Sequence, residues 1–109
     1  MISPLVGDDL GVCHNDDYRL VEWRGNGRIV FSYTQKGKAM SAHFAAEKSA
    51  LRQVKPAINE FCAWIFEQYP HCRMILANVA VDSVVRLINK CGFEHVLTCD
   101  EGVILARSK

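Results

Sequence analysis

Neither sign of charge dominates this sequence, and it contains no long apolar run. Thirteen Lys and Arg balance twelve Asp and Glu, which leaves a formal charge of +1. That charge gives the chain no general attraction to nucleic acid or to an acidic membrane surface. The longest apolar runs surround Asn78 and fall far short of the roughly 20 residues that span a bilayer. The N-terminus lacks the pattern of a secretory signal, so we expect a cytoplasmic protein that binds neither nucleic acid nor membranes.

Proline is also scarce, and glycine is not enriched. Three Pro and seven Gly among 109 residues exclude a collagen-like or low-complexity chain. The length is enough for one hydrophobic core but not for two. No repeat and no Pro/Gly/Ser-rich linker divides the chain. We therefore expect a single domain over residues 1–109, with an irregular N-terminal segment over residues 1–17.

The cysteines lack any spacing that would organise them. Their number is odd and no CxxC pair occurs, which fits neither a disulfide framework nor a structural zinc site. Two of them adjoin histidines, and a metal site can be assembled from these pairs on paper. Scattered Cys and His of this kind are more often core and surface residues. We expect no metal and five reduced thiols, at Cys13, Cys62, Cys72, Cys91 and Cys99.

Three consecutive segments have the pattern of strands. Tyr18–Arg24 and Arg28–Thr34 are rich in β-branched and aromatic residues, and Gly25, Asn26 and Gly27 lie between them. These residues favour a hairpin because they tolerate positive φ. After a second turn, Ala39–Ala46 alternates apolar residues with a period of two. The sequence predicts a three-stranded antiparallel meander.

The hydrophobic period then changes to that of a helix. Apolar residues at helical spacing follow Pro56, which the first turn of a helix tolerates. The pattern predicts a helix over Pro56–Gln68, stopped by Pro70, and then a buried strand over Cys72–Val81. Aromatic residues near the end of this helix fall outside its main apolar stripe, which favours a helix face that contacts a partner or a second copy in a homodimer. The residues outside the stripe are Ala63, Trp64 and Phe66.

A second helix and two strands complete the chain. Asp82 is a candidate N-cap for this helix, and Gly92 is suited to end it. Strands are predicted over Phe93–Thr98 and Val103–Arg107. The predicted order of elements is β-β-β-α-β-α-β-β.

That order resembles the core of the GNAT superfamily of N-acetyltransferases. The segment Val84–Val96 (VVRLINKCGFEHV) is similar to the family's helix that ends in a lysine, one residue, and Gly-Phe at the start of the next strand. The resemblance covers residues 18–108. It implies an α/β (α+β) fold with a mixed, mostly antiparallel central sheet and two main helices. It also implies that acetyl-CoA is the cofactor.

The resemblance places the pyrophosphate of the cofactor between the third strand and the first helix. The family has Arg or Gln, two residues, Gly, one residue, and Gly or Ala there, and this chain has RQVKPA. Lys55 replaces the glycine and offers a point charge instead, while Pro56 removes one N–H donor. A solvated basic loop is the alternative interpretation. The implied cofactor-binding residues are Arg52, Gln53, Val54, Lys55 and Ala57.

Two residues of the third strand region are candidates for the base that accepts a proton from an amine. His43 has an ordinary pKa of roughly 6.5, suitable for that role near neutral pH, and Glu47 follows on the same strand. A packed strand histidine is the alternative. Ile88 stands where many family members carry a tyrosine that protonates the coenzyme A thiolate, and isoleucine donates no proton. Residues 1–17 leave little room for the family's acceptor-site elements.

These features leave two functions open. The first is an N-acyltransferase that moves an acetyl group from acetyl-CoA to an unidentified amine. The second is a non-catalytic module of the same fold that binds a protein partner. Short proteins of this layout resemble virion-assembly or accessory proteins of tailed bacteriophages, which would place the chain in the host cytoplasm.

Overall fold

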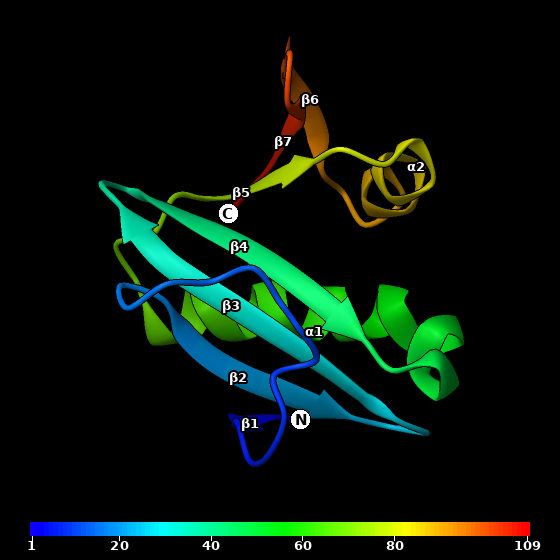
Figure 1. Cartoon of the computed structure of the whole chain (residues 1–109). Helices are drawn as coiled ribbons and strands as arrows, with labels where there is room; N and C mark the ends of the chain where they lie inside the picture. The colour runs from blue at the N-terminus through cyan, green and yellow to red at the C-terminus, as the bar shows by residue number, and fades with distance from the viewer.

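The computed structural model describes all 109 residues and contains one seven-stranded sheet with two helices (Figure 1). Along the sheet the strand order is β1-β2-β3-β4-β5-β7-β6. Every neighbouring pair is antiparallel except β4 and β5, which are parallel. This confirms the mixed, mostly antiparallel sheet that the resemblance implied. The strands are β1 (Ile2–Pro4), β2 (Arg19–Arg24), β3 (Arg28–Lys36), β4 (Ala39–Ala46), β5 (Met74–Val79), β6 (Glu94–Cys99) and β7 (Gly102–Ser108).

Three helical segments join these strands. A 3₁₀ helix, η1 (Lys48–Gln53), runs directly into α1 (Val54–Gln68), and α2 (Asp82–Asn89) follows β5. The prediction that the first helix begins at Pro56 was wrong by two residues, and η1 was not predicted. Pro56 is the third residue of α1, where its missing N–H costs nothing because the first N–H groups of a helix have no intrahelical partner. None of the helices is long and apolar enough to cross a membrane.

The β2–β3 hairpin forms where the sequence predicted it, but for a different reason. Neither Gly25 nor Gly27 has positive φ. A Cβ atom on Gly25 would collide with the side chain of Gln53, and one on Gly27 would lie 3.2 Å from the backbone nitrogen of Ala50. Both glycines are needed because the hairpin tip packs closely against η1.

The hydrophobic core lies between the sheet and α1. The rings of Phe31 and Phe61 stack with centroids 4.2 Å apart. The rings of Trp64 and Tyr33 meet edge to face with centroids 5.8 Å apart, and Phe66 also packs against the core. The aromatic residues that the sequence placed outside the apolar stripe therefore contact this chain's own core, so they give no separate indication of a partner.

The termini of α2 differ in part from expectation. Asp82 is the first helical residue rather than the N-cap, and the N-cap position is occupied by Val81, which makes no side-chain capping bond. Gly92 has a φ of 86° and lies in the turn that ends the helix, three residues after Asn89. Residues that favour this left-handed conformation end helices because they cost no Cβ strain.

The N-terminal segment is more ordered than expected. Its first residues form β1, which pairs Ile2 with Trp23 at the edge of the sheet. The following residues cross the sheet face opposite α1 (Figure 1). They are held by a hydrogen bond from the Ser32 hydroxyl to the carbonyl of Cys13, at 2.6 Å, and by one from the Val6 N–H to the Glu22 carboxylate, at 3.0 Å.

Candidate functional site

The two parallel strands at the centre of the sheet form a fork. β4 and β5 pair only through Ala39–Met74, Met40–Ile75 and Ser41–Leu76, and then they diverge (Figure 1). Beyond that point β4 still pairs with β3, and β5 still pairs with β7, on their outer edges. The inner edges therefore carry backbone N–H and C=O groups without a strand partner.

A cleft of about 370 Å³ occupies the fork. Its walls are the diverging parts of β4 and β5, with α1 and α2 behind them and residues 11–13 of the N-terminal segment alongside. Of 22 lining residues, 19 are hydrophobic. Phe31, Phe61 and Ile88 line it and are buried, whereas Leu51 lines it with 59% of its surface exposed. Such a cleft suits an extended ligand with apolar segments and a few polar groups.

His43 is the catalytic candidate that lies in this cleft. It projects from β4 on the face opposite Met40, and its ring lies beside that of Tyr18 with centroids 5.7 Å apart. Burial of the imidazole lowers the pKa of His43 below its ordinary 6.5. The ring is therefore neutral at neutral pH, which is the form that accepts a proton.

Glu47, the other candidate, lies elsewhere. Its Oε1 accepts a hydrogen bond from the backbone N–H of Arg28 at 2.6 Å and lies 3.8 Å from Nε of the same residue. Glu47 lines a separate polar hollow at the β2–β3 hairpin and not the cleft. The structure thus does not bring His43 and Glu47 together, and Glu47 contacts the hairpin.

Three of the five residues predicted to bind the cofactor are engaged in the fold. Val54 and Ala57 are buried in the core. Gln53 Oε1 accepts a hydrogen bond from the N–H of Asn26 at 2.7 Å, which ties η1 to the hairpin tip. Only the side chains of Arg52 and Lys55 remain exposed.

The predicted phosphate loop is also not an open loop. Residues 52–57 comprise the end of η1 and the first turn of α1. A 3₁₀ helix uses its N–H groups in i→i+3 bonds, as in the 2.9 Å bond from the Ala50 N–H to the Glu47 carbonyl. Fewer backbone donors are therefore free for an anion than the sequence suggested, and side chains would have to supply the charge.

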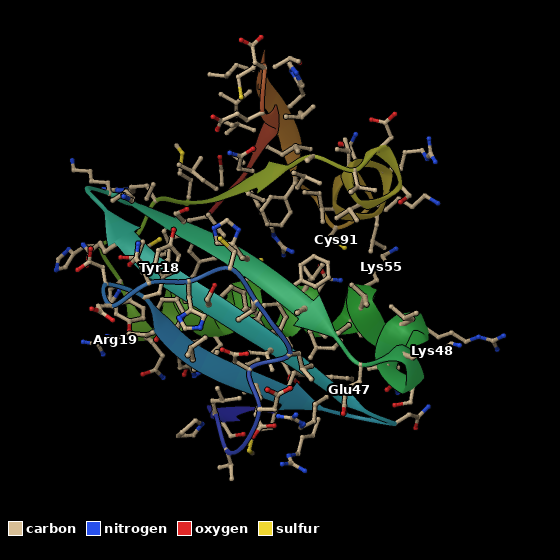
Figure 2. The ribbon with its side chains drawn as sticks, in the orientation of Figure 1. Tyr18, Arg19, Glu47, Lys48, Lys55 and Cys91 are labelled. Carbon is tan, nitrogen blue, oxygen red and sulfur yellow. The ribbon has the colours of Figure 1, made fainter.

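Cations do gather at the open end of the fork. Lys48 and Lys55 lie at this end, and Lys55 extends toward α2 near Cys91 (Figure 2). Both lysines and Arg52 are exposed, and none of the three forms an ion pair within the chain. Their charge is available to an anionic ligand.

The cysteines divide into two classes. Cys13 and Cys99 are exposed, and Cys13 lines the cleft, a position that its sequence context did not reveal. Burial raises the pKa of Cys72 and Cys91, and it raises the pKa of Cys62 to about 12. No group of three or more His, Cys, Asp or Glu side chains is arranged to hold a metal ion.

Comparison with solved structures identifies the architecture. Spermidine N-acetyltransferase SpeG from Vibrio cholerae, as the F149A mutant, superposes with a TM-score of 0.63 at 14% identity, over 85% of this chain and 65% of that one. An acetyltransferase from Bacillus subtilis in complex with CoA gives 0.68 at 12% identity, over 86% and 78%. The GNAT domain of PAT from S. lividans gives 0.68 at 14% identity, over 88% and 64%.

These likenesses establish a GNAT-like fold. No protein-family profile matches the sequence, and no curated protein matches it either. The chain spans 65% and 60% of the first two matched structures, so it is shorter than they are. Ile88 lies buried in the cleft wall, at the position where the resemblance to the family had placed a tyrosine.

Proposed function

We propose that this chain binds an acyl-coenzyme A in the fork between β4 and β5 and transfers the acyl group to an amine. The observation that carries the proposal is the apolar cleft between two unpaired strand edges, with uncompensated cations at its open end. The structural neighbours support it, because one is a CoA complex and another is named a spermidine N-acetyltransferase.

The residues present fit such a ligand. The pantetheine arm of coenzyme A carries amides that can pair with the inner edges of β4 and β5, as an added strand would. Its apolar parts fit the hydrophobic walls, and the exposed Leu51 adds apolar surface to the cleft. Lys48, Arg52 and Lys55 would contact the phosphates through their side chains.

The chemistry requires one base. The amine nitrogen bonds to the thioester carbon, the carbon–sulfur bond breaks, and the proton of the amine passes to the neutral imidazole of His43. The sulfur leaves as a thiolate and takes a proton from solvent, because Ile88 has none to give. Holding the amine against the thioester in an apolar cleft supplies proximity.

The first test is binding. Acetyl-CoA at 100 times its Kd would stabilise the folded state by about 2.7 kcal/mol, which raises Tm by roughly ten degrees for a domain of this size. The double variant Arg52→Ala/Lys55→Ala should bind about thirtyfold more weakly, taking about 1 kcal/mol for each lost solvent-exposed ion pair. Equal affinity of the double variant and the wild type would contradict the proposed phosphate contacts.

A matched control removes the same charge at the other end of β4. Lys36 and Lys38 are exposed at the β3–β4 turn, remote from the open end of the fork. The double variant Lys36→Ala/Lys38→Ala should bind acetyl-CoA as the wild type does. Spermidine is a suitable first acceptor, because the SpeG neighbour is named for it, and acetylation is followed by release of the CoA thiol.

The alternative is a non-catalytic module, such as a virion-assembly or accessory protein. The buried Ile88 and the scarcity of free backbone donors before α1 favour it. It predicts no thermal shift with acetyl-CoA, together with self-association in sedimentation or capture of one defined protein. A monomeric chain that binds acetyl-CoA tightly would contradict this alternative.

A further inference from the structure

Two side chains supply all of the nitrogen and oxygen that side chains bring to the cleft. They are His43 on β4 and Asn78 on β5, and every other lining residue is hydrophobic except Gly11. Polar groups this few in an apolar cleft fix the orientation of whatever binds there. The sequence singled out His43 but gave Asn78 no role.

The register of the sheet places these two residues on the same face, one on each side of the fork. Ser41 and Leu76 form the last pair before β4 and β5 diverge. His43 lies two residues beyond Ser41, and Asn78 lies two residues beyond Leu76. Because side chains two residues apart on a strand share a face, His43 and Asn78 lie on the same face of the sheet, one on each arm of the fork.

The fold makes no use of either side chain as a hydrogen-bonding group. The bonds in which side chains take part include neither the His43 ring nor the Asn78 carboxamide. Asn78 is on β5 and pairs with Ile104 of β7 through the backbone. Asparagine is less frequent in strands than β-branched residues are. Asn78 is exposed on this strand, so its carboxamide is accessible to a ligand.

We propose that Asn78 is a catalytic residue, whose carboxamide N–H donates to the carbonyl oxygen of the thioester while His43 takes the proton of the attacking amine. This role rests on the function proposed above. As the carbon–nitrogen bond forms, negative charge develops on the carbonyl oxygen, and the hydrogen bond donated by Asn78 stabilises that charge. When the carbon–sulfur bond breaks, the carbonyl re-forms and the negative charge leaves on the sulfur, which takes a proton from solvent.

The test combines rates with a signal that does not depend on turnover. Removing one such donor lowers kcat by about 10²–10³, so Asn78→Ala should lose that factor while its Kd for acetyl-CoA stays within about threefold. A hydrogen bond to the carbonyl lowers its infrared stretching frequency. Acetyl-CoA labelled with ¹³C at the carbonyl should therefore absorb at lower frequency when bound to the wild type, and near the free value when bound to Asn78→Ala.

Two further variants separate this role from a structural one. Asn78→Asp keeps the shape of the side chain but sets a carboxylate against the developing charge, so kcat should fall at least as far. Asn89→Ala removes an exposed asparagine at the end of α2, outside the cleft, and should change neither the rate nor the carbonyl band. Circular dichroism of each variant checks that it is folded.

The outcomes distinguish the inference from the function on which it rests. If the wild type binds and acetylates spermidine, and Asn78→Ala leaves kcat and the carbonyl band unchanged, the role of Asn78 is refuted and the function stands. A raised Kd with an unchanged band would make Asn78 a binding contact and would also refute the role. A wild type that does not bind acetyl-CoA overturns both.

Discussion

Cys13 and Cys99 are the two exposed thiols of the chain, and only Cys13 lines the cleft. Bound acetyl-CoA should therefore shield Cys13 from alkylation and leave the alkylation rate of Cys99 unchanged. At 100 times Kd about one molecule in a hundred is free of ligand, so alkylation of Cys13 should slow about 100-fold. Cys99, at the end of β6, is an internal control in the same molecule.

The buried thiols set the background of this experiment. Burial raises the pKa of Cys62 from 9.0 to about 12. Its reactive thiolate is therefore about 1,000-fold rarer at neutral pH than that of an ordinary thiol. Maleimide followed by peptide mass spectrometry, with and without acetyl-CoA, measures each site separately. Equal protection of Cys13 and Cys99, or protection of neither by a ligand known to bind, would refute the placement of the ligand in the fork.

Two other predictions concern pH and the N-terminal segment. Because burial lowers the pKa of His43, kcat/KM should stay constant as the pH is lowered to 6.5 and should decrease only below that pH. The variant His43→Gln should lose most of the rate and should no longer show this decrease at low pH. Below pH 6.5 the unfolded chain protonates His43 more readily than the folded chain does, so the free energy of unfolding of the wild type should decrease as pH falls from 6.5 toward the folded-state pKa. A urea midpoint that does not change with pH would contradict this. Glu22 is 1% exposed and accepts a hydrogen bond from the Val6 N–H, so Glu22→Ala should cost about 2–3 kcal/mol, because it leaves that N–H without its acceptor and opens a cavity. Thermal melts should show a Tm lower by roughly ten degrees or more, with the exposed Glu94→Ala as the unchanged control.

The strands and helices were predictable because their signals are local. Alternation in Ala39–Ala46 and the break at Pro70 depend only on residues near in sequence, and both elements end where expected. β1 was missed because three residues at a sheet edge carry no period. η1 was missed because its conformation depends on the hairpin tip, which Gln53 holds from 27 positions away.

The site was less accessible to sequence reasoning. His43 was found because an imidazole on a strand is chemically conspicuous. Asn78 was missed because its significance lies in the register between β4 and β5, which no local pattern encodes. Glu47 was expected to share the role of His43, but it follows the last residue of β4 and contacts Arg28, and only the three-dimensional arrangement of the hairpin reveals this.

The most direct test of the account is a calorimetric titration of the wild-type chain with acetyl-CoA. The fork, its apolar walls and the free cations at its open end predict saturable binding at one site per chain, competed by coenzyme A. Absence of measurable heat, with no thermal shift at about 1 mM ligand, would mean a binding free energy weaker than about −4.1 kcal/mol. That result would contradict the acyl-coenzyme A site and leave the non-catalytic module as the function to pursue.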